Sequence, residues 1–315
     1  MVDSCRVGQF KGALCSSFPW HLMVENPRVF EAQIFQRVTD MLKMRSILIV
    51  VCLSMLVVAQ AIMAKSNEFP GRDLYPEIPF IEIKDLKAKF KDVVIVDVRS
   101  AYEYETLRIR GALNFPLASK TFTEDMQKLR TKTDKPIVVY CNGKTCMKSY
   151  KAVIKCMHSD IKGVTAFDAG VLDWAKNNPA DALLLGKVLN DPKKLISKDD
   201  FKKHTITPDD FGNRIAETEA IVLDVRDRFQ REGISLFVGR EYRVYLDDTK
   251  RLDRFINKAI NENKPLLIYD AAGKQVVWLQ YYLQERGVKD YAFMDGGIHN
   301  YYKTMQESNH TSAKK

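Results

Sequence analysis

Two cysteines stand close together in one short polar segment, and their spacing suggests sulfur chemistry. The segment reads YCNGKTCMKS, so Cys141 and Cys146 are five positions apart with Gly143 between them. Lys144 and Lys148 add two positive charges to the same segment. A cysteine beside cations and free backbone amides is stabilised as the thiolate, the form that attacks electrophiles. The segment is therefore the first candidate for a reactive site.

A run of apolar, β-branched residues precedes this segment and predicts its place in the fold. Residues 135–140 read KPIVVY, which predicts a buried strand, and a helical pattern begins near Ser149. Ligands of open α/β sheets bind at the carboxyl ends of the strands. The loop amides and the N-terminus of the following helix would then favour a negative charge on Cys141. We therefore expect Cys141 to have a lowered pKa and to act as a nucleophile, rather than to be an inert buried cysteine.

The same spacing is compatible with functions other than single-thiol catalysis. Cys141 and Cys146 could form a reversible disulfide in a dithiol redox protein, or the loop could belong to a non-catalytic binding module. A Cys-loop phosphatase is disfavoured, because its chemistry needs an arginine where Met147 stands. Two roles stay open for Cys146: a resolving thiol that protects or discharges Cys141, or a packing residue at the start of the helix.

The chain contains three pairs of similar segments at a nearly constant offset, which indicates a duplicated domain. The pairs are VVIVDVR at 93–99 with AIVLDVR at 220–226, KPIVVY at 135–140 with KPLLIY at 264–269, and AFDAGVLDW at 166–174 with FMDGGIHNY at 293–301. The apolar runs read as buried parallel strands, and amphipathic helical patterns lie between them. Such alternation predicts an α/β fold in which each copy is a mostly parallel sheet flanked by helices.

Domain boundaries follow from the positions of these repeats. We place the first domain at 77–180 and the second at 194–305. Residues 181–193, which contain Gly186 and Asp191-Pro192, are expected to form a linker. The polar residues 306–315 are expected to form a disordered tail.

Four motifs together give the chain its resemblance to a known family. They are IVDVRSAYEYE at 95–105, RGALNFP at 110–116, YCNGKTCMKSYKA at 140–152 and DAGVLDW at 168–174. With them, the chain resembles an exported tandem rhodanese-like sulfurtransferase. The resemblance implies that Cys141 takes a sulfane sulfur from a donor anion such as thiosulfate. It would hold that sulfur as a persulfide and pass it to cyanide or a thiol, with no cofactor.

The resemblance also implies which residues bind the donor. The loop after Cys141 would cradle the persulfide and the anion through Asn142, Gly143, Lys144, Thr145, Cys146, Met147, Lys148 and Ser149. This loop is longer than the usual one and lacks its arginine, so Lys148 is the nearest cation. Asp97 and Arg99 are expected to tie the sheet edge to the loop. Arg108 stands where the family has a histidine, and two positions stay open for it: facing the site, or solvated.

The second copy lacks the cysteine. Its loop reads YDAAGKQ, so Asp270 stands at the position of Cys141, and a carboxylate cannot form a persulfide. We therefore expect the second domain to be catalytically silent and to support the first.

A secretory signal is predicted near the N-terminus. Residues 47–64 are almost entirely apolar, follow Lys43 and Arg45, and end in small residues. This pattern predicts an exported, periplasmic protein, with 1–64 as an upstream segment plus signal. The alternative is a retained membrane anchor, because 18 apolar residues can just span a bilayer. Met41 or Met44 would be a better start for such a signal.

Composition limits the other classes of partner and site. The net charge is +9, but the basic residues are spread along the chain and form no stripe or known nucleic-acid motif, so we expect no nucleic-acid partner. Downstream of the signal only Cys141, Cys146 and Cys156 remain, too few for a disulfide scaffold. The histidines lack metal-ligand spacing, so we expect no metal. Cys156 and Trp174 are expected in the core.

Overall fold

The computed structural model describes residues 41, 44, 68–226 and 235–312. Both halves of the described chain lie in one compact unit that begins at Glu68. The predicted signal or anchor at 47–64 lies outside the described residues, so it stays a prediction. Within the described residues, no helix has both the length and the apolar character needed to cross a membrane.

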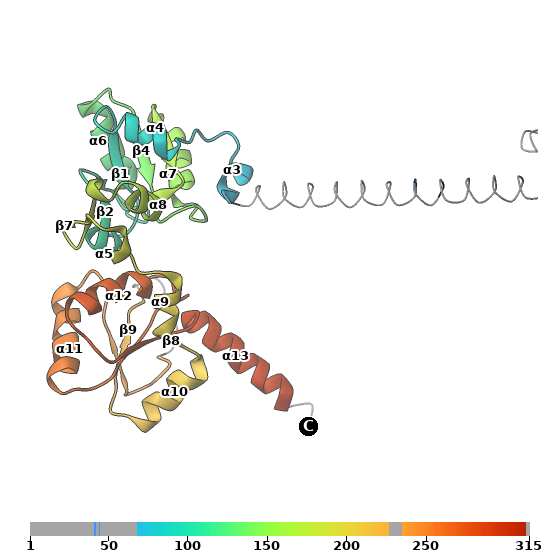
Figure 1. The fold of residues 1–315 in the computed structure, drawn as a ribbon, viewed down its shortest axis with the longest axis vertical. Helices are drawn as coiled ribbons and strands as arrows, with labels where there is room; N and C mark the ends of the chain where they lie inside the picture. Colours follow the sequence, from blue (N-terminus) through green and yellow to red (C-terminus); the bar gives the residue numbers. More distant parts are fainter. Residues whose placement is uncertain (1–40, 42–43, 45–67, 227–234, 313–315) are drawn as a thin grey trace, which may run out of the picture. The chain divides into compact units, whose positions relative to one another are not determined.

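The first half is built on a parallel sheet with strand order β3-β1-β4-β5. Figure 1 labels its two central strands, β1 and β4. Its strands are β1 (Val94–Asp97), β3 (Leu113–Asn114), β4 (Ile137–Tyr140) and β5 (Val164–Phe167), and its helices are α3 (Pro70–Leu74), α4 (Ile83–Ala88), α5 (Ala101–Thr106), α6 (Phe122–Lys132), α7 (Lys148–Met157) and α8 (Gly170–Asn177). Alternate residues of each strand point to opposite faces. Val139 of β4 packs in one apolar cluster with Phe122 of α6 and Val153 of α7. Val138 packs in another with Trp174 of α8. Both faces of the sheet are therefore buried.

A second, small sheet corrects the predicted linker. Strands β2 (Leu107–Ile109), β6 (Ala182–Leu184) and β7 (Lys187–Val188) form an antiparallel sheet in the order β2-β6-β7, and the short helix η1 (Pro179–Asp181) leads into it. Much of 181–193 therefore belongs to the first half, because its backbone pairs with β2.

The N-terminal boundary of the first half also lies earlier than the predicted residue 77. Arg72 of α3 forms an ion pair with Asp168 at 2.7 Å, and the ring of Tyr75 stacks on Tyr150 with centroids 5.6 Å apart. These contacts fasten residues 68–76 to the body of the first half.

The second half repeats the parallel sheet, with strand order β10-β9-β11-β12-β8. Its strands are β8 (Thr205–Ile206), β9 (Ile221–Asp224), β10 (Glu241–Arg243), β11 (Leu266–Tyr269) and β12 (Tyr291–Met294), and its helices are η2 (Pro192–Lys194), α9 (Lys198–Lys203), α10 (Pro208–Glu217), α11 (Thr249–Asn261), α12 (Val276–Glu285) and α13 (Gly297–Ser312). The registers agree: Asp97 pairs with Tyr140 in the first half, and Asp224 with Tyr269 in the second. The predicted duplication is confirmed.

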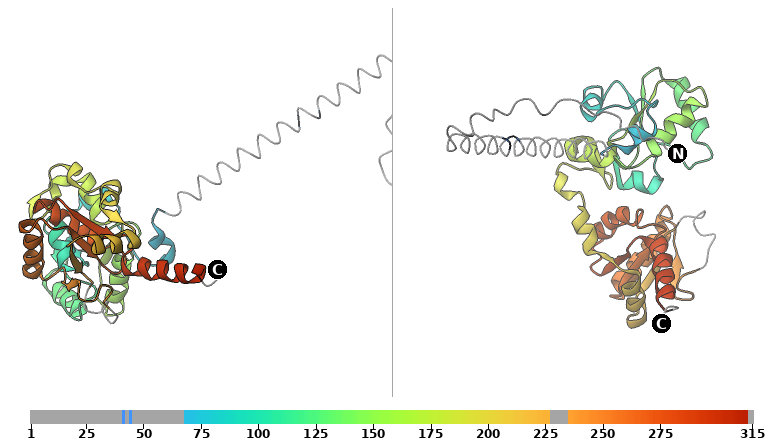
Figure 2. Two further views of the ribbon diagram at one scale, coloured as in Figure 1. Left: turned by 90° about the horizontal axis from the view of Figure 1, so that it is seen from below. Right: turned by 90° about the vertical axis from the view of Figure 1, so that its right-hand side faces the viewer.

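The C-terminal helix corrects the predicted tail. Helix α13 continues to Ser312, through much of the segment expected to be disordered. Figure 2 shows its last turns running beyond the rest of the second half. The polar composition of this segment reflects a helix with little to pack against, since Gln306 and Glu307 are exposed.

Candidate active site

The cysteine loop occupies the connection between β4 and α7, at the carboxyl edge of the parallel sheet, as the sequence predicts. Cys141 follows the last residue of β4, and Lys148 is the first residue of α7. A turn closes within the loop, where the amide of Cys146 donates to the carbonyl of Gly143 at 2.8 Å.

The first turn of α8 packs against the backbone of the cysteine loop. The amide of Val171 donates to the carbonyl of Cys141 at 3.0 Å, and that of Leu172 to Asn142 at 3.3 Å. Gly170 has φ of +67°, and a Cβ there would lie 2.4 Å from the nitrogen of Gly143. Only glycine permits this approach, because a Cβ would collide with loop backbone. The DAGVLDW motif thus supports the loop through its backbone, and also through Asp173, which pairs with Lys144 at 3.2 Å.

A buried ion pair anchors the loop to the sheet edge. Asp97 and Arg99 have no exposed surface and are paired at 2.6 Å. Arg99 Nη1 also donates to Asn142 Oδ1 at 3.2 Å. The same pair recurs in the second half, where Arg226 and Asp224 lie 2.7 Å apart. Charge-assisted bonds of this kind are strong and directional, so the pair holds the first residue after Cys141 in place.

Glu103 is a residue of the site that the sequence analysis missed. It belongs to a capping box with Ser100 at the start of α5, yet its Oε1 accepts from Asn142 Nδ2 at 2.9 Å. The ammonium of Lys148 lies 3.8 Å from Oε2. Burial would raise the pKa of Glu103, but Lys148, Arg99 and Asn142 outweigh it and the pKa is lowered. A buried carboxylate therefore stands beside the loop and orients both Asn142 and Lys148.

The two loop cysteines differ in a way that overturns the expected pKa of Cys141. Cys141 is fully buried, and its thiol donates to the carbonyl of Cys146 at 3.1 Å and to Ser149 Oγ at 3.7 Å. Burial raises its pKa well above the ordinary value, and the neighbouring Cys146 adds to the effect. Cys146 is half-buried, and its pKa is lowered to about 6. The neighbouring Cys141 side chain is the largest cause, and the backbone near Lys148 and Asn142 and the charge of Lys148 lower the pKa further against burial. The ionisation of each loop cysteine therefore depends on the other.

This arrangement predicts the pH dependence of thiol alkylation. Above its pKa of about 6, Cys146 is a thiolate, and it loses that form as the pH falls through this value. Alkylation of Cys146 by iodoacetamide should therefore rise through about pH 6 and then level off, whereas an ordinary cysteine rises near pH 8.5. Cys141 and Cys156 should stay unmodified in the folded protein, since both are buried. Peptide mapping after timed alkylation measures this, and half-maximal reactivity of Cys146 above about pH 8 would contradict it.

The cations of the predicted site are placed unequally. Lys144 forms ion pairs with Glu68 and, at 3.2 Å, with Asp173, so its charge is neutralised beside the loop. Lys148 is exposed, and its one described ion pair is a loose one, 3.8 Å from Glu103. Lys148 is therefore better placed than Lys144 to meet an incoming anion.

The other residues predicted for the site lie in different surroundings. Arg108 pairs with Glu105 at 3.0 Å and lies over the ring of Tyr104, and no described contact joins it to the cysteine loop. Thr145 is exposed, and Met147 packs against the cluster on the α6–α7 side. Cys156 and Trp174 are in the core, as expected.

In the second half, a carboxylate fills the equivalent loop. Asp270 follows β11 and accepts from the amides of Ala272 at 2.9 Å, Gly273, Gln275 at 2.6 Å and Val276 at 3.2 Å. The amides after this strand thus converge on an anion supplied by the chain itself. Because no thiol is present and the amides are occupied, this loop offers no place for sulfur chemistry.

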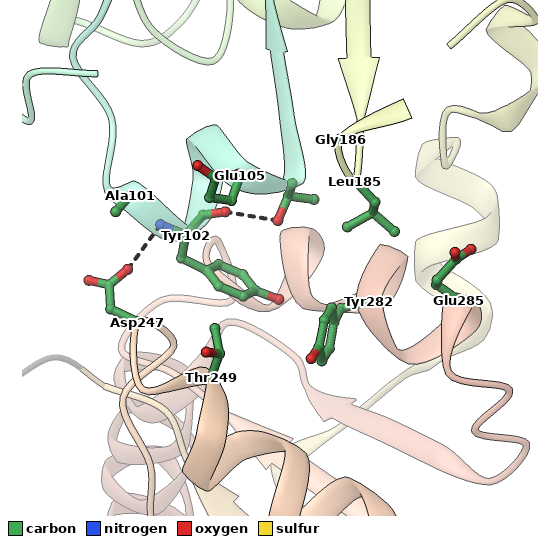
Figure 3. A pocket seen from close by; sticks show the side chains of 10 residues that line it. Ala101, Tyr102, Glu105, Leu185, Gly186, Asp247, Thr249, Tyr282 and Glu285 are labelled. Carbon is green, nitrogen blue, oxygen red and sulfur yellow. Dashed lines mark hydrogen bonds between the residues drawn. The ribbon is translucent and has the colours of Figure 1, made fainter. Parts of the chain in front are cut away.

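A cavity of about 430 Å³ lies apart from the cysteine loop. It is lined by residues of both halves, among them Tyr102, Leu185, Asp247, Thr249 and Tyr282, and contains no residue of the loop (Figure 3). The amide of Tyr102 donates to Asp247 at 2.9 Å across it. In the described part of the chain, no group of three or more His, Cys, Asp or Glu side chains could hold a metal ion.

The fold and this loop define a protein with two α/β domains, one of which carries a cysteine at the carboxyl edge of its sheet. The family model described as Rhodanese-like domain matches residues 82–177 and 207–304. The chain therefore belongs to the rhodanese-like family and carries two such domains in tandem.

The individual relatives match only part of the chain and at modest sequence identity. The tRNA uridine(34) hydroxylase of Salmonella paratyphi B is 30% identical over 132 residues, which cover 40% of this chain and 37% of the relative. That of Pectobacterium carotovorum subsp. carotovorum is 35% identical over 98 residues, covering 30% and 26%. The chain thus spans about a third of the length of these curated relatives. Among solved structures, a thiosulfate sulfurtransferase from Pseudomonas aeruginosa is 17% identical with a TM-score of 0.36, covering 72% of this chain and 42% of that one.

Proposed function

We propose that this protein is a sulfurtransferase that moves sulfane sulfur from a small donor anion, such as thiosulfate, to cyanide or a thiol through a cysteine persulfide. One observation carries the proposal: Cys141 directly follows β4 at the carboxyl edge of the first sheet, in a loop that leads into α7 and the exposed Lys148. The sequence assigned the persulfide to Cys141. Membership of the rhodanese-like family supports sulfur transfer in general.

The surroundings of the loop fit a donor that carries negative charge. Lys148 presents an exposed ammonium at the start of α7, and the helix N-terminus adds partial positive charge. No carboxylate of the loop itself takes up its amides, in contrast to Asp270 in the second half. Glu103 lies 3.8 Å from the Lys148 ammonium, so it neutralises that charge only in part. An anion can therefore be attracted without leaving a buried charge unpaired.

The relatives suggest a second candidate, namely modification of uridine in tRNA. These relatives are named for that activity, and their identity of 30% and 35% to this chain motivates testing it here. Recognition of RNA needs a basic surface and would weaken steeply with salt. Lys144 is neutralised by Glu68 and Asp173, so the loop itself offers little of such a surface. Sulfur transfer to a small acceptor is the function that the described site supports better.

The proposal is tested by following one sulfur atom. Reduced protein treated with thiosulfate and then alkylated should gain a single sulfur by intact mass, and added cyanide should remove it as thiocyanate. Sulfate is the matched control, because it has similar charge and shape but no sulfane sulfur. A protein that gains no sulfur and yields no thiocyanate contradicts the proposal. A disulfide formed without any bound sulfur would instead favour the dithiol redox alternative.

A further inference from the structure

The cavity drawn in Figure 3 lies where the two halves meet. Tyr102 and Thr106 of α5 line it from the first half, and Thr249 of α11 and Tyr282 of α12 line it from the second. Its volume of about 430 Å³ falls within the range of small-molecule sites. Such sites occur preferentially between domains, so both the size and the position of this cavity suit a small ligand.

The interior of the cavity is mostly apolar and contains a polar atom without a partner. Tyr102 is 5% exposed, and its hydroxyl forms no hydrogen bond with any described residue. Figure 3 shows this hydroxyl pointing across the cavity toward Tyr282. The hydroxyl of Thr106 is already used, since it donates to the backbone carbonyl of Tyr102 at 2.8 Å. Tyr282 likewise donates to Asp253. A buried hydroxyl without a partner destabilises the fold, so the Tyr102 hydroxyl is free to bind a ligand.

The rim of the cavity is acidic. Glu105, Asp247 and Glu285 line it and are exposed, and no lysine, arginine or histidine is among the described residues that line it. Glu105 and Glu285 are paired with neighbouring cations at 3.0 and 2.8 Å. Arg286 lies over the ring of Tyr282, but an aspartate 2.8 Å away neutralises its charge. Asp247 has no ion pair in the described part of the chain, so the rim attracts a positive charge.

We infer that this cavity binds a small organic cation that has an aromatic body and a polar group at its inner end. The ammonium would meet Asp247 at the rim, where a charge-assisted hydrogen bond can form. The body would pack against the rings of Tyr102 and Tyr282, which suit both aromatic and cationic groups. The polar group would pair with the Tyr102 hydroxyl. Because no residue of the cysteine loop lines the cavity, this site is separate from the proposed sulfur transfer.

Tyramine is the probe, because its ammonium, ring and hydroxyl match the three parts of the site. Isothermal titration calorimetry with the full chain should show that it binds. Phenethylammonium lacks the hydroxyl and should bind about fivefold more weakly, the effect of one hydrogen bond. The anion p-hydroxyphenylacetate has a similar length and the opposite charge, and should bind more than about tenfold more weakly. Equal binding of the cation and the anion would overturn the inference, and so would a failure of tyramine to bind.

Tyr102→Phe tests the unpaired hydroxyl. This variant should bind tyramine about fivefold more weakly and phenethylammonium as the wild type does, because only tyramine has a group for the hydroxyl to bind. Its Tm should equal or exceed that of the wild type, since the hydroxyl has no partner in the fold. Equal losses for the two amines, or a clear fall in Tm, would show that the hydroxyl serves the fold and would overturn the inference.

Asp247→Asn tests the charge at the rim. Asparagine keeps an acceptor for the amide of Tyr102, so the contact between the halves is retained. Both amines should bind about fivefold more weakly, a modest loss because water screens an exposed carboxylate. Tyr302→Phe is the control, because it removes a hydroxyl from an exposed tyrosine of α13, and it should bind both amines as the wild type does. Unchanged binding by Asp247→Asn would contradict the proposed cation site.

Discussion

Replacing Gly170 with alanine is expected to disable the cysteine loop and to destabilise the first half. The new Cβ would lie 2.4 Å from the nitrogen of Gly143 and 2.6 Å from the carbonyl carbon of Asn142, and both are backbone atoms that cannot swing away. The φ of +67° adds strain for any residue with a Cβ. Together we expect a loss of about 3 kcal/mol and a fall in Tm of about 5–10 °C. Displacing the loop by about 1 Å should also lower sulfur transfer about a hundredfold in the protein that remains folded.

Gly297→Ala is the matched control in the second half. Gly297 has φ of +58°, and its Cβ would lie 2.4 Å from the carbonyl oxygen of Asp270. The same collision should therefore produce a similar loss of stability, but sulfur transfer per folded molecule should stay at the wild-type level. Calorimetric unfolding and transfer assays below the transition separate the two effects. Equal losses of transfer in both variants would mean that Gly170 acts through general stability and not through the loop.

The fold could be predicted from the sequence because its main signals are local. Runs such as IVVY and LLIY are short, apolar and β-branched, and each is repeated at a constant offset, so the parallel sheet and the duplication were both visible. The boundaries were harder, because they depend on partners distant in sequence. Leu183 belongs to the first half only because it pairs with Arg108, which lies far earlier in the chain.

The loop's position was also predictable, but the burial and hydrogen bonding of its two cysteines were not. Alternation along β4 puts Ile137, Val139 and Cys141 on one buried face, and this pattern alone already indicated a shielded sulfur. The expected nest of loop amides indicated an accessible thiolate instead. Ser100 and Glu103 have the spacing of a capping box, which signals the start of a helix. The second role of Glu103, as acceptor from Asn142, needs a tertiary contact that no spacing reveals.

Asp270→Ala is expected to destabilise the second half strongly. The carboxylate accepts four backbone amides, and it lies at the N-terminus of α12, where negative charge is favourable. Removing it leaves these donors without their acceptor, at a cost of about 3 kcal/mol after partial compensation by water. Asp290→Ala is the control, because Asp290 makes an exposed ion pair with Arg214, and surface pairs contribute about 1 kcal/mol or less. A wild-type Tm for Asp270→Ala would show that the hydrogen bonds between these amides and the carboxylate do not stabilise the second half.

The vacated loop of Asp270→Ala should then accept an anion from solution. Sulfate or thiosulfate at ten times its Kd would return about 1.4 kcal/mol by mass action, while the wild type, whose carboxylate occupies the amides, should gain nothing specific. Thiosulfate would bind there without losing its outer sulfur, since Asp270→Ala still has no thiol in this loop. The rise in Tm with anion concentration measures the binding, and the absence of thiocyanate from this loop is checked in a background of Cys141→Ser and Cys146→Ser. Rescue without turnover would show that amides after the central strand are enough to hold the anion, and that the reaction in the first half depends on the thiols its loop supplies.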